Sequence, residues 1–331
     1  MNNSFFESLF INKSIHADFG NGQDPWGKYN LHLNSLNGLI NNIIINKVGA
    51  FSNALIQISS AINCAITLDV ENIVIQGEYL CKDTHPIYNN DPIWFIKNAM
   101  YEYLPGKFLI TSNDHKVEGT TLSGDFFDIA MGNGLRNLLF KDKNFNMNSF
   151  KLIKDNLNLN FNKYYFNRDF LTIYIRSGDV FTSQLAPGYG QPPLVFYKKI
   201  IQSKNWGHIL IVYEDLGNPV IAPLQDYCLE KNISFDIFTG DLKDTIEILL
   251  NAKNLVLARG TFSTIIASMN EKLINVYDFH GTSGFIPISC ESKISAYDIS
   301  GDYIQRIMNG NWMNSIEQRE LMITYDSVVL K

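Results

Sequence analysis

Short apolar runs alternate with segments of helical periodicity through the C-terminal half of the chain, and this alternation restricts the fold more than any other feature of the sequence. Runs typical of buried strands occupy residues 170–176, 208–213, 234–238, 254–258 and 273–276, and apolar residues recur at helical spacing through 194–203, 219–231, 243–252 and 261–270. Strands that alternate with helices form parallel sheets with helices on both faces. We therefore predict an α/β domain built on a doubly wound parallel sheet.

The N-terminal half carries the same alternation over a shorter stretch. Residues 41–48 and 72–76 are strand-like, and residues 50–69 between them have apolar side chains at helical spacing. This order predicts a βαβ unit and therefore a second α/β domain.

An Asn- and Lys-rich stretch of weak periodicity separates the two halves and ends near Tyr165. We place the domain boundary there, which gives an N-terminal domain at 1–165 and a C-terminal domain at 166–331. The less regular segment from Gly301 is expected to form a helical tail that packs back onto one of the domains.

Composition excludes several classes of protein. The chain has 331 residues, of which 46% are hydrophobic, so it can form two cores. Its net charge of −6 argues against binding to nucleic acid, which favours a basic surface. The four cysteines lie far apart without the paired spacing of a zinc site or a disulfide framework. No apolar run reaches about 18 residues and the first residues do not form a secretory leader, so we expect a cytoplasmic protein.

An Arg-Ser-Gly-Asp turn follows the strand at 170–176 and places Arg176 at the carboxyl end of that strand. In α/β sheets, ligands bind outside the carboxyl ends of the strands. The planar guanidinium of Arg176 matches the oxygens of a phosphate, and Gly178 allows backbone N–H groups to approach the same anion. The alternative interpretation is a surface ion pair between Arg176 and Asp179 that only shapes the turn.

Two other strand-to-helix junctions carry polar residues where a helix begins. In VGAFSNALIQ, Gly49 follows a strand, and Ser52 and Asn53 open a helix. Helix N-termini attract anions, although such side chains also serve as plain helix caps. The second junction, ARGTFSTIIAS, carries a glycine and three hydroxyl side chains: Gly260, Thr261, Ser263 and Thr264.

Taken in this order, the three segments resemble those of the fucosyltransferase superfamily of GT-B glycosyltransferases, which includes bacterial α-1,2- and α-1,6-fucosyltransferases and protein O-fucosyltransferases. The resemblance covers roughly residues 43–280. VGAFSNALIQ resembles the family's glycine-rich turn with Gly49 and Asn53 retained and Ser52 in place of a glycine. Tyr174-Ile-Arg176-Ser-Gly-Asp179 resembles its arginine motif, with Tyr174 where a histidine is common. The resemblance implies an α/β fold of the GT-B type, in which a cleft separates two Rossmann-like domains.

The resemblance also implies roles for particular residues. Arg176 would bind the β-phosphate of GDP-fucose, and Asn53 would orient the acceptor or the donor. Asp244 would read guanine, with Asp241 as the neighbouring competitor and helix capping as the alternative for both. Glu214-Asp215 resembles a further acidic segment of the family, to which we assign no contact. The segment that would close over the diphosphate comprises Thr261, Phe262, Ser263 and Thr264.

The implied activity is inverting hexosyl transfer from a nucleotide sugar, expected to be GDP-fucose, to a hydroxyl group of a glycan or lipid-linked oligosaccharide. Such a bacterial enzyme would act in the synthesis of capsule or lipopolysaccharide, with no more than peripheral contact with the inner face of the membrane. We expect no metal cofactor, because the chain has no Asp-x-Asp pair and an arginine with helix N-termini can replace a divalent ion.

The general base is the least constrained part of this hypothesis. Asp179, Asp125, Asp128 and Glu78 all provide a carboxylate, and nothing in the sequence places one of them beside an acceptor hydroxyl. Residues 187–197, with two glycines and Pro192-Pro193, predict a stiff loop beside the arginine turn. Its aromatic neighbours could stack on a ligand or merely pack: Phe181, Tyr189 and Tyr197.

Three alternatives remain. A GT-B enzyme could use another nucleotide sugar, since loop changes alone can alter the substrate of a fold. The chain could also be a catalytically idle protein that binds a nucleotide or sugar. A dinucleotide-dependent oxidoreductase is disfavoured, because VGAFSNAL lacks the G-x-G-x-x-G pattern.

Overall fold

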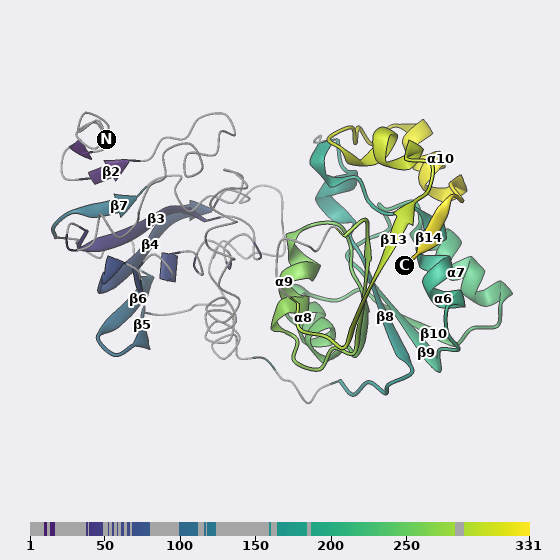
Figure 1. Cartoon of the computed structure of the whole chain (residues 1–331), viewed down its shortest axis with the longest axis horizontal. Coiled ribbons are helices and arrows are strands. Elements are labelled where there is room, and N and C mark those ends of the chain that lie inside the picture. The colour runs from purple at the N-terminus through teal and green to yellow at the C-terminus, as the bar shows by residue number, and fades with distance from the viewer. Residues whose placement is uncertain are drawn as a thin grey trace. The chain divides into compact units, whose positions relative to one another are not determined.

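In a computed structural model, the chain divides into two compact units, Met1–Asn158 and Leu159–Lys331 (Figure 1). The predicted boundary is at residue 165. The structure describes strands and single residues between Phe10 and Ser123, residue Leu159, and residues 164–331 apart from 184–186 and 282–287. Each unit is considered by itself below.

The first unit contains a seven-stranded sheet in the order β1-β2-β7-β3-β4-β6-β5. Its central strands β3 and β4 are parallel and bury Ile43, Ile45, Ile73 and Val74. The described residues between these two strands are mostly helical and buried, so the predicted βαβ unit is confirmed. The strands are β1 (Phe10–Ile11), β2 (Ser14–His16), β3 (Asn42–Val48), β4 (Asn72–Tyr79), β5 (Ala99–Leu104), β6 (Lys107–Thr111) and β7 (Thr121–Ser123).

The second unit contains another seven-stranded sheet, in the order β10-β9-β8-β11-β12-β13-β14. All neighbouring pairs are parallel except β13 with β14. The strands are β8 (Phe170–Ile175), β9 (His208–Tyr213), β10 (Phe235–Phe238), β11 (Asn254–Val256), β12 (Asn275–Phe279), β13 (Ser292–Asp298) and β14 (Val328–Leu330). The α/β class predicted from the sequence is therefore confirmed.

The order of the parallel strands fixes where a ligand would bind in this unit. Counted along the chain from β8, the first six strands lie in the order 3-2-1-4-5-6, the doubly wound arrangement. The order reverses between β8 and β11, and in such sheets ligands bind beyond the carboxyl ends of the strands at this reversal. We call the side where the parallel strands end the carboxyl edge, and the side where they begin the amino edge.

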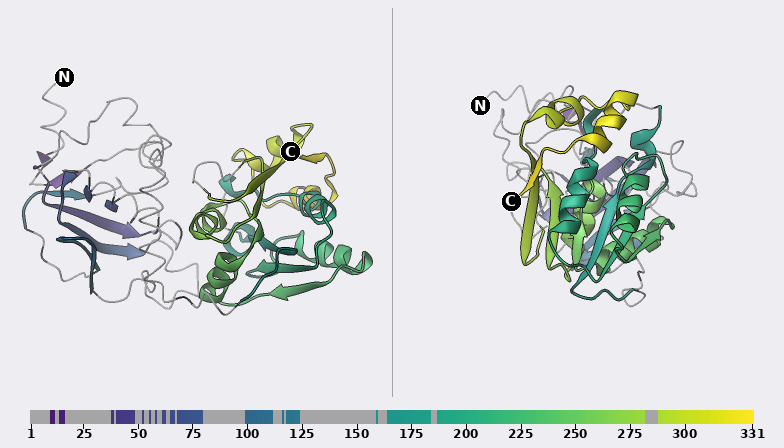
Figure 2. Two further views of the ribbon diagram at one scale, coloured as in Figure 1. Left: turned by 60° about the horizontal axis from the view of Figure 1, so that its bottom comes forward. Right: turned by 90° about the vertical axis from the view of Figure 1, so that its right-hand side faces the viewer.

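Helices cover both faces of the second sheet (Figures 1 and 2). Helices α8 and α9 pack against each other on one face, and α6 contacts α7 and α10 on the other. Both faces of β8 are consequently buried, including the polar Thr172 and the large Tyr174. The helices are α6 (Leu194–Gln202), α7 (Ile221–Glu230), α8 (Leu242–Asn251), α9 (Thr261–Met269) and α10 (Ile316–Thr324), with 3₁₀ turns η6 (Gly178–Phe181) and η7 (Pro187–Tyr189) and a π-helix η8 (Ile304–Met308).

The segment after Gly301 forms η8 and α10, and α10 packs against α6. Strands β13 and β14 were not predicted. None of the described helices has the length and apolar character that a membrane-spanning segment requires.

Candidate functional site

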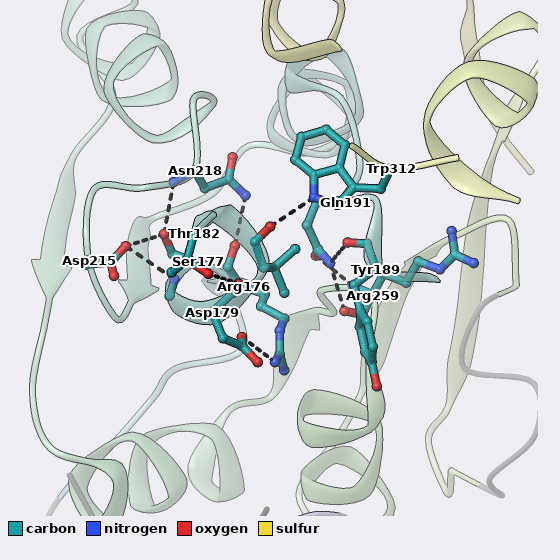
Figure 3. Close-up of polar contacts among 12 residues, drawn as sticks. Arg176, Ser177, Asp179, Thr182, Tyr189, Gln191, Asp215, Asn218, Arg259 and Trp312 are labelled. Carbon is teal, nitrogen blue, oxygen red and sulfur yellow. Dashed lines mark hydrogen bonds and ion pairs between the residues drawn. The ribbon is translucent and has the colours of Figure 1, made fainter. Parts of the chain in front are cut away.

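Arg176 lies directly after β8 at the carboxyl edge, where its side chain is 17% exposed (Figure 3). One terminal nitrogen donates to Asp179 Oδ1 at 2.7 Å, and the guanidinium carbon lies 5.4 Å from the ring centre of Tyr189. Within the described part of the chain, the buried Nε of Arg176 has no hydrogen-bond partner. The ion pair considered from the sequence is therefore present, and it lies at the edge where doubly wound sheets in general bind ligands.

Burial and charge act on Arg176 in opposite directions. Burial alone would lower the pKa of Arg176, but the nearby Asp179, Tyr174 and Glu214 outweigh it and raise that pKa above its ordinary value. The side chain therefore carries its positive charge at any physiological pH.

A polar network from the end of β9 shapes the turn that carries Arg176 (Figure 3). Asp215 Oδ1 accepts hydrogen bonds from the hydroxyl of Ser177 and from the backbone N–H groups of Gly178 and Gly217. The amide of Asn218 donates to the Arg176 carbonyl at 2.9 Å, and its backbone N–H donates to Ser177 Oγ at 2.9 Å. This network gives the acidic segment 214–215 a role that we did not assign from the sequence.

The hydrogen bonds also set the charge of Asp215. Burial would raise the pKa of Asp215, but the bonds from Ser177, Gly217 and Gly178 outweigh this effect and hold that pKa below its ordinary value. Asp215 is thus ionised while it holds the turn.

Gly178 is required by the geometry of the same turn. Its φ is 62°, in the left-handed region that favours glycine, and a Cβ at this position would lie 2.3 Å from Glu214 Oε2. The Glu214 carboxylate therefore lies directly against the backbone of the arginine turn.

Residues of the C-terminal segment also donate hydrogen bonds to the loops that follow β8 and β9. The indole N–H of Trp312 donates to the Val180 carbonyl at 2.9 Å, and Arg319 of α10 donates to the Gly217 carbonyl at 2.8 Å. Val180, directly after the arginine turn, and Gly217, in the loop after β9, are thus each bonded to a residue more than a hundred positions further along the chain.

Helix α9 begins beside Arg176, because β8 and β11 are neighbours in the sheet. The N-cap position is Gly260, which has no side chain to cap the helix and adopts a φ of 138°. A Cβ at Gly260 would lie 3.6 Å from a terminal nitrogen of Arg176. A guanidinium and the positive end of a helix therefore meet where the strand order reverses, and both attract an anion.

The side chains of the first turn of α9 contribute mainly to its structure. Ser263 Oγ donates to the Ala258 carbonyl at 3.0 Å and Thr264 Oγ1 to the Gly260 carbonyl at 3.1 Å. The ring of Phe262 is buried and packs against Tyr174 at 5.3 Å. A role of 261–264 at the diphosphate stays a prediction.

The two acidic residues at the start of α8 differ in position. Asp241 is the N-cap, and its carboxylate accepts from the Asp244 backbone N–H at 2.7 Å. Asp244 lies in the first turn of α8, which packs against α9. Asp241 thus acts as a helix cap, while guanine recognition by Asp244 stays a prediction.

The aromatic residues near the arginine turn separate into packing residues and one exposed ring. Tyr197 is fully buried within α6, so the predicted stiff loop ends before Leu194 and Tyr197 cannot stack on a ligand. Phe181 packs against Trp312 at 5.3 Å. Tyr189 is 37% exposed and stays the candidate for contact with a ligand.

Two residues at this edge were missed by the sequence analysis. Gln191 is buried between the loop that carries Tyr189 and the residue before Gly260. Arg259 has its pKa lowered by burial, and one terminal nitrogen contacts Met308 Sδ at 3.1 Å. The position of Arg259 directly before Gly260 was the available signal in the sequence.

Of the residues selected from the N-terminal half of the sequence, the structure describes Ser52 and the backbone of Glu78. Ser52 is helical and buried, and the backbone of Glu78 lies in β4, although its side chain is outside the described residues. Within the described ranges, no three His, Cys, Asp or Glu side chains gather closely enough to hold a metal ion. The remaining predicted residues lie outside the described part of the chain: Gly49, Asn53, Asp125 and Asp128.

No protein-family model and no curated protein sequence matches the chain. Among solved structures, E. coli heptosyltransferase WaaC with ADP is similar at 9% identity, covering 85% of this chain and 98% of that chain with a TM-score of 0.37. The α-1,6-fucosyltransferase NodZ co-crystallised with GDP has 11% identity, coverage of 78% and 96%, and a TM-score of 0.36. Selenomethionine-labelled fucosyltransferase NodZ from Bradyrhizobium has the same identity and coverage with a TM-score of 0.33.

Proposed function

We propose that the protein is an inverting, metal-independent glycosyltransferase of the GT-B type whose C-terminal unit binds the diphosphate of a nucleotide sugar. One observation carries this proposal: the Arg176 guanidinium lies against the N-terminus of α9 at the reversal of strand order. This place offers a fixed positive charge and a helix start to one anion.

The reaction uses this charge where negative charge develops. An acceptor hydroxyl oxygen attacks the anomeric carbon of the sugar, and the bond from that carbon to the diphosphate oxygen breaks with inversion. A carboxylate takes the proton from the hydroxyl. Arg176 and the α9 N-terminus stabilise the departing diphosphate, so their contribution is greatest in the transition state.

The identity of the proton acceptor is part of the proposal. The Asp179 carboxylate is 40% exposed but binds Arg176, so it fixes the guanidinium as well as offering a base. Asp125, Asp128 and Glu78 of the first unit are the other candidates, and Asn53 would orient the acceptor or donor.

We further propose GDP-fucose as the donor. A carboxylate on the first turn of α8, Asp244, can accept from N1–H and the 2-amino group of guanine, a donor pair that adenine lacks. The acceptor would be a glycan or a lipid-linked oligosaccharide in the synthesis of a bacterial surface polysaccharide, and the enzyme would work in the cytoplasm.

Calorimetric binding of GDP, UDP, CMP and ADP to the wild-type protein and to Asp244→Ala tests this proposal. We expect selective binding of GDP, with the selectivity reduced in Asp244→Ala and unchanged in Asp226→Ala. Asp226 lies on α7 on the other face of the sheet, so its replacement removes the same charge at a distance. Preference for another nucleotide would contradict GDP-fucose as the donor but remain compatible with a glycosyltransferase. The absence of any nucleotide binding would contradict the whole proposal.

A catalytically idle binding protein is the second candidate. Tyr174, which stands where a histidine is common in the resembling family, is buried against Phe262 and provides no exposed imidazole. Tight binding of GDP-fucose without transfer to any glycan hydroxyl and without hydrolysis would favour this candidate over the enzyme.

A further inference from the structure

The side chain of Gln191 occupies a fully buried position at the carboxyl edge, and all its hydrogen-bonding groups are used. Its amide nitrogen donates to the carbonyl of Tyr189 at 2.8 Å and to the carbonyl of Arg259 at 3.0 Å. Its amide oxygen accepts from the backbone N–H of Arg259 at 3.2 Å. One side chain therefore binds both backbone groups of the residue that precedes Gly260 (Figure 3).

The backbone of Gln191 is fixed as well. The buried hydroxyl of Tyr303 donates to the Gln191 carbonyl at 2.6 Å. A Cβ at the preceding Gly190 would lie 2.1 Å from the Ile307 carbonyl oxygen, so the chain passes directly against η8 at this point. Gln191 thus connects Tyr303 and the backbone beside η8 to the residue that precedes α9.

These contacts connect the three parts of the candidate anion site. Tyr189 covers the Arg176 guanidinium, and its ring edge would lie 4.0 Å from a Cβ at Gly260. The bonds of Gln191 to the backbones of Tyr189 and Arg259 hold the segment that carries this ring against the residue before the N-cap of α9. Arg176 is confined between them.

We propose that Gln191 is a positioning residue of the diphosphate site, which sets the α9 N-terminus against the Arg176 guanidinium before the ligand arrives. The inference rests on the proposed function and extends it to a residue that touches no ligand. Preorganised charges bind an anion more strongly, because no free energy is spent on arranging them during binding. Gln191 therefore acts through Gly260 and Tyr189 on affinity for the diphosphate.

The opposite end of α9 provides a matched control. Asn270 is also buried, its amide donates to the carbonyls of Leu249 and Ala252 at 2.9 and 2.8 Å, and its amide oxygen accepts from the Lys272 backbone N–H at 2.7 Å. It makes the same three kinds of bond as Gln191 but lies at the amino edge. A purely structural role would give the two residues the same phenotype.

The test compares Gln191→Met with Asn270→Leu, two neutral replacements of similar volume that add no charge near an anion. Thermal unfolding of both variants is followed by calorimetric titration with GDP, inorganic pyrophosphate and guanosine, well below the lower melting temperature. We expect both variants to have a lower melting temperature than the wild type. Only Gln191→Met should bind GDP and pyrophosphate at least 10-fold more weakly, with guanosine affinity changed less than 2-fold.

The outcomes separate this inference from the proposed function. Wild-type affinity for GDP and pyrophosphate in Gln191→Met, or an equal loss in Asn270→Leu, would overturn the positioning role while leaving the glycosyltransferase proposal intact. If the wild-type protein binds pyrophosphate but does not prefer GDP, the donor is not GDP-fucose. The pyrophosphate titration would then still test the positioning role of Gln191. A wild-type protein that binds neither ligand would overturn both proposals.

A milder variant covers the case in which Gln191→Met does not fold. Tyr303→Phe removes only the hydroxyl that holds the Gln191 carbonyl and leaves the side-chain bonds of Gln191 in place. We expect a 2- to 3-fold weaker affinity for pyrophosphate in this variant. Unchanged pyrophosphate affinity in Tyr303→Phe would then count against the proposal.

Discussion

At the amino edge of the second sheet, the amide of Asn254 donates to the carbonyls of Arg168 and Phe170 at 2.9 and 2.8 Å and accepts from Asn275 at 2.6 Å, whereas at the carboxyl edge Arg176 keeps a buried Nε without a partner in the described structure. The same parallel strands connect these two edges. Asn254 at the amino edge is therefore fully engaged within the fold, whereas Arg176 at the carboxyl edge retains an unused donor.

The starts of α8 and α9 repeat this contrast within the carboxyl edge. Asp241 caps α8 with its carboxylate, whereas α9 begins at a glycine with a φ of 138° beside Arg176. A serine or aspartate cap is the ordinary way to satisfy a helix start. At the start of α9 the glycine makes no such bond, and the neighbouring group is the Arg176 guanidinium.

The largest expected effect lies at the amino edge. Asn254→Leu removes three hydrogen bonds of a fully buried amide, each worth about 1 kcal/mol, so we expect the free energy of unfolding to fall by about 3 kcal/mol. Nucleotide affinity should not change. Urea unfolding and GDP titration measure both quantities, with the exposed Asn311→Leu as a control that loses one hydrogen bond at the surface.

Arg176→Met should weaken nucleotide binding strongly and change stability little, the opposite of Asn254→Leu. The variant should lose about 1.5–3 kcal/mol of GDP binding, or roughly 10- to 150-fold in affinity, because the charge-assisted contact with phosphate disappears. Its unfolding free energy should change by less than about 1 kcal/mol, since the partner Asp179 is partly exposed. Calorimetry and urea unfolding check this, and Arg168→Met, at an exposed arginine of the amino edge, should change neither. A large stability loss in Arg176→Met would break the contrast between the edges.

A smaller effect is expected for Gly260→Ala. A Cβ at this position meets no atom closer than 3.6 Å, so the cost comes from the positive φ and should be about 1–2 kcal/mol in unfolding free energy. A shift of the α9 start would also weaken GDP binding. Gly188→Ala, at a position with no neighbour within 4 Å, is the control, and equal melting temperatures for the two variants would contradict the strain at Gly260.

Asp298, at the end of β13, tests a carboxyl-edge residue that is fully engaged. Burial would raise the pKa of Asp298, but hydrogen bonds from the Tyr325 hydroxyl and the Ile304 backbone N–H outweigh it and lower that pKa. A lowered pKa in the folded state gives stability that is present above the unfolded value of about 4 and is lost as the pH falls through the folded value.

The comparison for Asp298 is between wild type and Asp298→Asn in urea unfolding at pH 7, 5 and 3. We expect the variant to be about 1 kcal/mol less stable at pH 7 and the difference to shrink at pH 3. Asp302→Asn, which loses only an exposed ion pair of 3.6 Å with Arg306, should show little difference at any pH. A constant difference across this range for Asp298→Asn would show that its charge is not the cause.

Strands β8 to β12 of the second unit could be predicted from the sequence, because hydrophobic periodicity depends only on residues close together in the chain. The inner strands β8, β9, β11 and β12 are mostly apolar, which burial of both their faces requires, whereas the edge strand β10 is not buried. β13 was missed because it is largely exposed at its start and includes Lys293 and Ser295, so it lacks an apolar run. β14 has only three residues, too few to show a pattern, and it pairs with β13 and packs against α6.

The candidate site was predictable only in part, for a related reason. Arg176 could be found because it directly follows its own strand. The role of Asp215 depends on β9 lying beside β8, and that of Gln191 depends on a residue 68 positions away. Such contacts depend on strand order, which local patterns do not specify. Asp241 and Asp244 could not be separated from spacing alone, because capping depends on the residue at which α8 begins.

The hydrogen bonds from Trp312 and Arg319 have a consequence for synthesis on the ribosome. Both residues are translated after β8–β13, so a nascent chain can contain the whole parallel sheet while the loops after β8 and β9 still lack the bonds to Val180 and Gly217. The hydrogen bonds that fix the arginine turn are therefore completed late in translation. A chain cut before Trp312 would lack both bonds together with α10, β14 and the core side chains of Trp312 and Met322.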